Sequence, residues 1–296
     1  MNSESELFSR FASLLPARGE QTHKGDFGTL TVIAGSRRFR GAASLAVEAA
    51  LRSGCGIVRL AAIEPVAAAA AAAVREAVFL PLPEGRDGGI AAGALTPIPR
   101  ELTGSRAILA GCGMGDTSDT AAAVGTLLSG VDVPLVLDAD ALNALKYEPD
   151  RLREAATPPI LTPHVGEAAR LLGRSADAVR RDRAAAASEA AARFRAVVVL
   201  KDYETVIASP EGLLSVCELP NSGLARGGSG DVLAGLISSF LAQGQAPAKA
   251  AELGVLLHAL AGQEARRSLT ARAMLPSDLI ASLPAVFRRA EEIAGR

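Results

Sequence analysis

Short apolar runs alternate with longer amphipathic stretches along most of the chain. The runs are rich in Val, Ile, Leu and Ala and are bounded by glycine, proline and polar residues, a pattern typical of buried strands. The stretches between them repeat their apolar positions with helical spacing. We expect strands at 30–34, 57–61, 107–110, 134–138, 160–162 and 197–201.

The segments between and after these strands predict the helices. We expect helices at 41–53, 67–75, 117–128, 139–146, 165–172, 231–241, 247–267 and 276–289. Ser175 has the character of an N-cap, and the Ala- and Arg-rich sequence after it predicts one long helix that ends near Phe194. The runs 204–208 and 213–217 flank a Pro–Glu–Gly turn, which predicts a hairpin. We expect 81–93, which contains EGRDGG, to be a loop.

This alternation of strands and helices predicts an α/β fold with a mostly parallel sheet and helices on both faces. Because no stretch has the composition of a linker, we expect one domain over 1–296, with 1–20 as an N-terminal helix or tail. In such sheets ligands bind beyond the carboxyl ends of the strands. Polar residues that directly follow a predicted strand are therefore the candidates for a functional site.

Composition narrows the function classes. The 296 residues are 49% hydrophobic but only 3% aromatic, so a large core must be aliphatic, with alanine prominent in it. A net charge of −1 argues against a broad nucleic-acid surface and against binding to anionic membranes. The cysteines Cys55, Cys112 and Cys217 have no CxxC spacing, so neither a zinc site nor a disulfide framework is indicated. The N-terminal sequence lacks the pattern of a secretory signal, and we expect a cytoplasmic protein.

The strongest candidate for chemistry is the segment 221–231, NSGLARGGSGD, which leads directly into an apolar helix. Gly227, Gly228 and Gly230 carry no Cβ atom, so the backbone there can approach an anion closely. The first turn of a helix also offers unpaired N–H groups and a partial positive charge. Together these features predict a phosphate site, with Asp231 as a general base for a substrate hydroxyl. The alternative is that Asp231 only caps the helix.

Two further strand ends carry candidate residues with two interpretations each. The GCGMG turn at 111–115 allows a close backbone approach to a ligand, or is a plain strand-to-helix turn. Asp138 and Asp140 follow the next strand, where they either orient Mg²⁺ through water or cap a short helix.

The last two strands also end in polar residues. In the sequence LTPHVGE, His164 either hydrogen-bonds a polar ligand or is structural, and Glu167 either caps a helix or holds a metal-bound water. Lys201 ends its strand as a flexible cation for a phosphate or as a surface lysine. His258 has apolar neighbours, and we expect it in the core.

Taken in order, these motifs resemble one family. The segments KGDFGTLTVIAGS, RGAASLAVEAALRSGCGIV, GCGMG, LVLDADALNAL, ILTPHVGEAARLLG, VVVLKDYETVIASPEG and NSGLARGGSGDVLAGLISSFLAQG are similar to those of NAD(P)H-hydrate dehydratases, a ribokinase-like branch of nucleotide-dependent enzymes. The resemblance runs from about Lys24 to Leu283. It implies a three-layer ribokinase-like fold and a stand-alone dehydratase domain without the epimerase domain.

The resemblance also implies an activity. It is that of an ADP-dependent (S)-NAD(P)H-hydrate dehydratase, a lyase that repairs hydrated NADH or NADPH and releases AMP and phosphate. ADP or ATP is the co-substrate, with Mg²⁺. Phosphorylation of the ring hydroxyl converts a poor leaving group into a good one. The alternatives are a vitamin-precursor kinase of the same fold and a non-catalytic nucleotide sensor.

Carried over position by position, the resemblance assigns roles to individual residues. It implies that Asp231 activates the hydroxyl while the amides of Gly228, Ser229 and Gly230 hold the transferred phosphoryl group. The hydrated dinucleotide would contact Ala42, Gly115, His164 and Asp231. The nucleotide would contact Lys201, Asp202, Tyr203, Glu204, Thr205 and Gly230. The metal ligands are undefined, with Asp138, Asp140 and Glu167 as candidates through water.

This sequence differs from the family pattern at some positions, and the resemblance also implies partners. Asp202 stands where the family usually has glycine, Ser222 where it has proline, and Arg226 where it has threonine. Arg226 is a candidate phosphate contact that would offset the charge of Asp202. These changes bear on the nucleotide preference more than on the reaction. We expect a homo-oligomer, with a tetramer as one candidate, and functional coupling to a separate NAD(P)H-hydrate epimerase.

Overall fold

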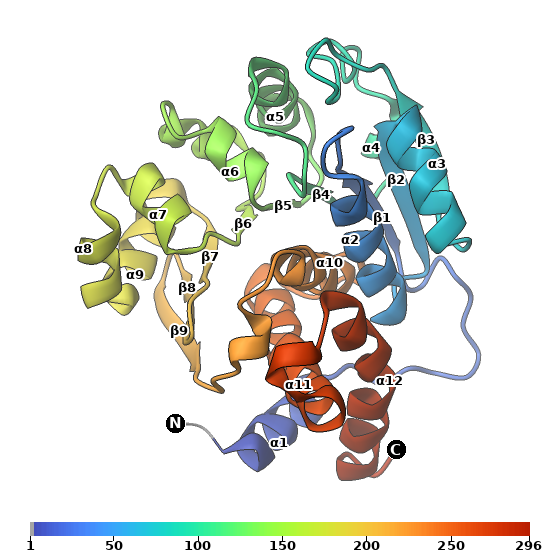
Figure 1. Ribbon diagram of the computed structural model, residues 1–296, viewed down its shortest axis with the longest axis vertical. Coiled ribbons are helices and arrows are strands. Elements are labelled where there is room, and N and C mark those ends of the chain that lie inside the picture. Colours follow the sequence, from blue (N-terminus) through green and yellow to red (C-terminus); the bar gives the residue numbers. More distant parts are fainter. Residues whose placement is uncertain (1–2) are drawn as a thin grey trace.

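One nine-stranded sheet organises the chain in the computed structural model, which describes residues 3–296 (Figure 1). The strand order is β3-β2-β1-β4-β5-β6-β7-β8-β9; β1 to β7 run parallel, and β8 and β9 are antiparallel to their neighbours. The strands are β1 Thr29–Ile33, β2 Ile57–Ile63, β3 Val78–Leu82, β4 Ala107–Ala110, β5 Leu135–Leu137, β6 Ile160–Leu161, β7 Val197–Leu200, β8 Thr205–Ser209 and β9 Gly212–Cys217. The predicted α/β fold with a mostly parallel sheet is confirmed.

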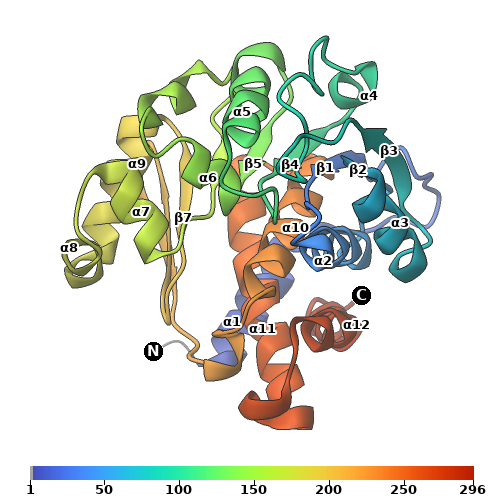
Figure 2. The same cartoon turned by 45° about the horizontal axis from the view of Figure 1, so that its top comes forward.

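Helices cover both faces of this sheet (Figure 2). The order of strands reverses at β1 and β4, so right-handed crossovers place α2 and α5 on opposite faces. α10 and α11 lie on the face of α2, α1 and α12 pack outside them, and α9 lies against β7 and β8. The helices are α1 Glu4–Leu14, α2 Arg40–Arg52, α3 Glu64–Ala73, α4 Arg100–Thr103, α5 Ser118–Gly130, α6 Asp140–Ala144, α7 Val165–Leu172, α8 Ala176–Arg181, α9 Arg183–Phe194, α10 Ser229–Ala242, α11 Pro247–Ala273 and α12 Pro276–Ile293.

One expectation about local structure is wrong, and a second is right except at its start. The single helix expected from Ser175 to Phe194 is two helices, because Asp182 leaves the helical region (φ −146°, ψ 83°). Its carboxylate then accepts a hydrogen bond from the N–H of Ala185 at 2.9 Å and caps α9. The segment expected as a loop from residue 81 begins inside the edge strand β3. Proline is rare inside strands, so Pro81 argued against a strand here. An edge strand tolerates proline because one of its sides forms no hydrogen bonds with another strand.

The alanine-rich core lets α10 pack between two other helices at very short range. A Cβ atom on Gly235 would collide with the backbone of Ala46 in α2, and one on Gly254 of α11 would collide with Ile237 in α10. α10 is accordingly buried along most of its length. This packing fixes the position of its first turn, at the carboxyl edge of the sheet. No helix among residues 3–296 is long and apolar enough to cross a membrane.

We predict that Gly235→Ala destabilises the protein by about 2 kcal/mol, because the added methyl group must push the α2 and α10 backbones apart. Urea denaturation measures the change. Gly93→Ala is the matched control, since a Cβ atom there would meet nothing within 4 Å. Equal stability of Gly235→Ala and the parent protein would show that the two helices separate without cost.

Candidate active site

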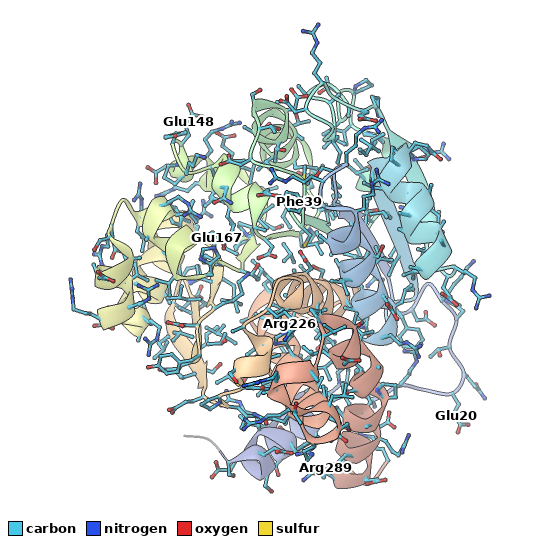
Figure 3. The ribbon with its side chains drawn as sticks, viewed as in Figure 1. Glu20, Phe39, Glu148, Glu167, Arg226 and Arg289 are labelled. Atoms are coloured by element: carbon cyan, nitrogen blue, oxygen red, sulfur yellow. The ribbon has the colours of Figure 1, made fainter. Side chains whose placement is uncertain are left out.

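The carboxyl ends of β4, β5, β6 and β7 meet the N-terminus of α10 at one edge of the sheet (Figure 1). Figure 3 labels side chains from three elements around this edge: Phe39 before α2, Glu167 on α7 and Arg226 before α10. Of these three, Glu167 and Arg226 were expected near the site from the sequence, and they come from separate segments that converge here.

The glycine-rich loop opens α10 without a side-chain cap. Gly228 is the N-cap in the left-handed conformation (φ 98°), and no side-chain cap hydrogen bond forms there. A Cβ atom on Gly228 would lie 2.8 Å from Leu45 and 3.0 Å from Pro276. Asp231 is the third residue of the helix, so the interpretation of Asp231 as its N-cap is wrong. The N–H of Ser229 donates to the carbonyl oxygen of Arg226 at 3.2 Å, so among the described residues the N–H groups of Gly228, Gly230 and Asp231 are left for an anion.

A buried ion pair lies directly below this loop. Lys201 Nζ donates to Asp138 Oδ1 at 2.6 Å, and Thr162 Oγ1 donates to the same oxygen at 2.7 Å. The side chain of Asp138 is 2% exposed and that of Lys201 is 20% exposed, so the interpretation of Lys201 as a surface lysine is wrong. A Cβ atom on Gly230 would be 3.4 Å from Lys201 Nζ. The pair therefore forms the charged floor of the glycine-rich loop.

Burial raises the pKa of Asp231 to about 6, and the nearby charge of Asp138 adds to the increase. Lys201 opposes this shift but does not cancel it. Carboxylate oxygens of Asp138 and Asp231 and the Cys112 thiol lie within 4.8 Å of one another. Burial also raises the pKa of Cys112, so the thiol stays protonated. A carboxylate with a pKa near neutrality is suited to act as a general base.

The GCGMG turn connects this floor to α2. Gly111, Gly113 and Gly115 all have positive φ, and a Cβ atom on Gly113 would lie 2.9 Å from the Cβ atom of Ala42. The N–H of Gly115 donates to Asp140 Oδ2 at 2.8 Å. Neither aspartate caps α6, because its N-cap is Ala139 and no side-chain cap hydrogen bond forms. Ala42 and Gly115 thus lie on either side of one backbone turn at the edge of the site.

His164 and Glu167 form a capping box at the start of α7. Glu167 Oε2 accepts from the N–H of His164 at 2.8 Å, and His164 Nδ1 accepts from the N–H of Gly166 at 2.9 Å. Burial raises the pKa of Glu167 to about 7, whereas burial and the charge of Lys201 lower the pKa of His164. Of the two interpretations of Glu167, helix cap or holder of a metal-bound water, the structure supports the helix cap. The imidazole of His164 remains half exposed beside Lys201.

The loop after β7 directs its acidic side chains away from Lys201. Arg183 Nη2 donates to Glu204 Oε2 at 2.7 Å, and Arg183 Nη1 lies 3.8 Å from Asp202 Oδ2. Tyr203 is exposed, and Thr205 begins β8. The charge of Asp202 is thus offset by Arg183. Sequence analysis missed Arg183, because nothing in the local sequence shows that α9 begins beside this loop.

Two other residues are placed by contacts with α11. Arg226 Nη2 donates to the carbonyl oxygen of Arg272 at 2.9 Å, so the end of α11 anchors the guanidinium that we expected to contact a phosphate. His258 lies beneath the first turn of α10, with Nε2 3.0 Å from the carbonyl oxygen of Ser229. Burial lowers the pKa of His258 to about 4, so it is neutral, which agrees with the expected core position.

Among the possible metal ligands at this edge, one carboxylate, that of Asp138, fits Mg²⁺. Mg²⁺ prefers oxygen ligands and keeps several waters, and a protonated thiol such as Cys112 is a poor ligand for it. Asp140 and Glu167 are engaged with backbone N–H groups. Asp138 makes its two short hydrogen bonds through Oδ1. Its Oδ2 accepts only a long contact from Cys112 Sγ at 3.9 Å and is therefore the oxygen that would bind a metal-bound water.

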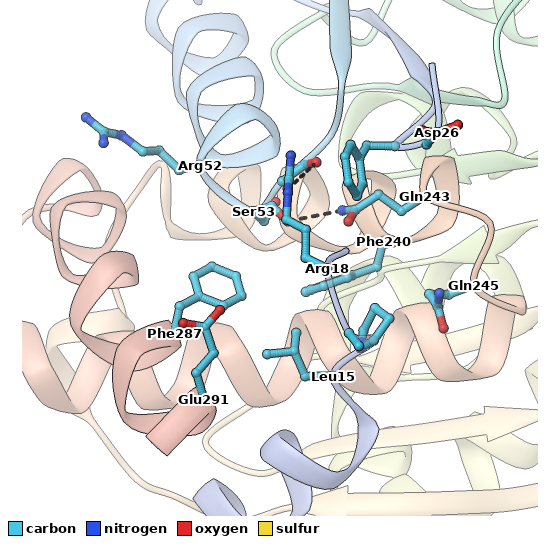
Figure 4. Close-up of a pocket in the computed structure, with 14 residues that line it drawn as sticks. Leu15, Arg18, Asp26, Arg52, Ser53, Phe240, Gln243, Gln245, Phe287 and Glu291 are labelled. Carbon is cyan, nitrogen blue, oxygen red and sulfur yellow. Dashed lines mark hydrogen bonds between the residues drawn. The ribbon is translucent and has the colours of Figure 1, made fainter. Parts of the chain in front are cut away.

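A separate cavity of about 310 Å³ lies at the opposite edge of the sheet, near the starts of β1 and β2 (Figure 4). Arg18 Nη1 donates to the carbonyl oxygen of Gly54 at 3.3 Å, and Gln243 Nε2 donates to that of Ser53 at 3.0 Å. The cavity contains no residue of the glycine-rich loop or of its charged floor. We therefore place the active site at the carboxyl edge and not at this cavity.

Comparison with known proteins agrees with this geometry. The family model for NAD(P)H-hydrate dehydratase matches residues 30–285. The chain belongs to this family. A bifunctional NAD(P)H-hydrate repair enzyme from Moorella thermoacetica is 41% identical over 280 residues, which cover 95% of this chain and 53% of that protein. The chain spans about half the length of the first curated relatives it matches.

Other members of the NAD(P)H-hydrate dehydratase family match the chain along most of their own length. An ADP-dependent (S)-NAD(P)H-hydrate dehydratase from Neisseria meningitidis is 41% identical over 266 residues, covering 88% of this chain and 84% of that protein. The crystal structure of the ADP/ATP-dependent enzyme from Bacillus subtilis, co-crystallised with ATP and Mg²⁺, has a TM-score of 0.84 at 33% identity and covers 98% of both chains. A ribokinase-like protein from Enterococcus faecalis shares the fold, with a TM-score of 0.80 at 23% identity.

We predict that Asp231→Asn stabilises the metal-free protein by about 2 kcal/mol at pH 8. Folding raises the pKa of this carboxyl from 3.8 to about 6, so above pH 6 the folded state holds a charge that it disfavours. The gain should shrink as the pH falls from 6 and vanish near pH 3, where the carboxyl is protonated in both the folded and the unfolded state. Urea denaturation of the variant and the parent protein at pH 8 and near pH 3 measures this difference in stability. Asp132→Asn, at an exposed position, is the control; an identical response of the two variants would contradict the prediction.

Proposed function

We propose that this protein is an ADP-dependent (S)-NAD(P)H-hydrate dehydratase, a lyase that restores hydrated NADH or NADPH and releases AMP and phosphate. The observation that carries this proposal is the carboxylate of Asp231, with a pKa of about 6, in the first turn of α10 over the Lys201–Asp138 pair. The stand-alone relative from Neisseria meningitidis bears the name of this activity and supports the assignment.

In the proposed reaction Asp231 accepts the proton of the hydroxyl on the nicotinamide ring. The resulting oxygen attacks the β-phosphorus of ADP, and the bond from that phosphorus to the bridging oxygen breaks, so AMP leaves. The N–H groups of Gly228 and Gly230 hold the transferred phosphoryl group, and Lys201 offsets its charge. The N–H of Ser229 would join them by exchanging the carbonyl oxygen of Arg226 for a phosphoryl oxygen. The phosphorylated ring then loses phosphate together with a ring proton and becomes the reduced dinucleotide. Mg²⁺, when bound, neutralises phosphate charge, and Asp138 would hold it through water.

The remaining assignments belong to the same proposal. We infer that Ala42, Gly115 and His164 contact the hydrated dinucleotide. Ala42 and Gly115 border the turn that carries Cys112 beside Asp231, and His164 lies beside Lys201. We infer that Lys201, Asp202, Tyr203, Glu204, Thr205 and Gly230 form the nucleotide side. Residues 1–296 would act as one dehydratase domain, since the nine strands share one sheet.

We also propose a cytoplasmic homo-oligomer, with a tetramer as one candidate, that is functionally coupled to an NAD(P)H-hydrate epimerase. The bifunctional names of several relatives support the coupling.

The decisive experiment incubates the protein with hydrated NADH, Mg²⁺ and ADP. We expect the absorbance of the reduced nicotinamide to return, with one phosphate and one AMP released per turnover. A parallel reaction with ATP measures the nucleotide preference. A stable phosphorylated product without recovery of absorbance would support a small-molecule kinase instead, and no reaction with either nucleotide would overturn both assignments.

We predict that Asp231→Asn lowers turnover by about 100-fold or more while ADP binding stays within about two-fold, because only the general base is removed. For the parent protein, kcat/KM should fall as the pH decreases through about 6, where Asp231 takes up its proton. Steady-state kinetics from pH 5 to 8, together with calorimetric titration of ADP, measure both effects. Full activity of the variant would remove Asp231 from the mechanism.

A further inference from the structure

Arg183 holds three consecutive residues of the loop after β7. Its Nη2 donates to the hydroxyl of Tyr203 at 2.7 Å and to Glu204 Oε2 at 2.7 Å. Its Nη1 lies 3.8 Å from Asp202 Oδ2. The guanidinium carbon lies 4.6 Å from the centre of the Tyr203 ring. A single side chain on α9 therefore sets the conformation of the loop between Lys201 and β8.

This arrangement is costly for the fold alone. Arg183 is the first residue of α9, where the helix dipole disfavours a positive charge. Its side chain is only 14% exposed, and its buried Nε has no hydrogen-bond partner among the described residues. A buried donor such as Arg183 Nε, which has no hydrogen-bond partner, destabilises the fold, so a role other than stabilising the fold is needed to explain it. The contacts of Arg183 with Tyr203 and Glu204 supply one, because they shape a loop at the edge of the proposed active site.

Tyr203 is left with one free ring face. Its ring is stacked on Arg183 and its hydroxyl is held, yet the residue is 62% exposed. Tyr203 follows Lys201 by two residues, a distance of at most about 7 Å along the chain. Lys201 Nζ lies beside Gly230 in the floor of the anion loop. A nucleotide with its phosphates in that loop can therefore extend its base toward Tyr203.

We propose that Arg183 is a positioning residue for the adenine nucleotide, which fixes Tyr203 so that the free face of its ring stacks on the base. The inference rests on the proposed function, because it takes the loop after β7 to be the nucleotide side of the site. Stacking on an aromatic face is tolerant of the base but needs a ring of fixed orientation.

The first test replaces the guanidinium. For Arg183→Met we expect the Kd and KM for ADP to rise about ten-fold, the loss expected when one stacking contact is weakened, while kcat at saturating ADP stays within about two-fold. Arg183→Lys keeps the charge but not the planar fork, so it should recover part of the affinity. Arg193→Met is the matched control, because Arg193 on the same helix pairs with Asp150 and stacks on Phe194 far from the loop.

The second test asks whether Arg183 acts through the ring. Tyr203→Leu should weaken ADP binding about as much as Arg183→Met, whereas Tyr203→Phe, which keeps the ring, should change it by no more than about two-fold. The double variant Arg183→Met with Tyr203→Leu should bind like either single variant, because both remove the same platform. Additive losses, or an unchanged Kd in Arg183→Met, would overturn the inference.

Calorimetric titration with ADP alone keeps this outcome separate from that of the proposed reaction. A parent protein that binds ADP without restoring hydrated NADH would refute the activity but leave the role of Arg183 testable. An active parent protein with Arg183→Met indistinguishable in KM and Kd would refute only the role of Arg183.

Discussion

The buried ion pair between Lys201 and Asp138 is the interaction on which the active-site edge depends. It joins the end of β7 to the end of β5 and lies directly below Gly230. The charge of Asp138 helps to raise the pKa of Asp231, and the charge of Lys201 helps to keep His164 neutral. Burial alone would lower the pKa of Lys201, but Asp138 and Glu167 outweigh it and raise that pKa. Removing either partner would leave a buried charge uncompensated, with a large cost in stability.

The alanine-rich composition has a functional consequence through helix packing. Because Gly235 and Gly254 carry no side chain, α10 fits between α2 and α11 with its backbone almost in contact with theirs. Side chains in such cores are small, so a shift of one helix is not absorbed by repacking of its neighbours. The first turn of α10 is thereby held over the ion pair, with its N–H groups uncapped. The position of the anion loop is therefore set by contacts remote from it.

The site gathers positive potential locally in a protein whose net charge is −1. Backbone N–H groups at Gly228 and Gly230 provide it without any side chain, and Lys201 adds a charge that Asp138 largely neutralises. At the loop after β7, Arg183 balances Asp202 and Glu204 in the same way. Lys201 and Arg183 are thus each paired with acidic side chains, so the unpaired N–H groups of the glycine-rich loop supply the positive potential for an anion.

The sequence by itself determined the order of strands and helices, the mostly parallel sheet and the loops that could carry chemistry. Those features depend on local periodicity and on glycine, which neighbouring residues fully define. It did not determine the break at Asp182, because an aspartate within an Ala- and Arg-rich run can either continue a helix or cap a new one. It did not determine the edge strand containing Pro81 either, because an edge position exists only in the assembled sheet. The tertiary structure alone decided that Asp231 is not a cap and that Glu167 is one. It also paired Lys201 with Asp138 and brought Arg183 to Tyr203. Such contacts join residues far apart in sequence, and only the packing of the sheet and its helices brings their side chains together.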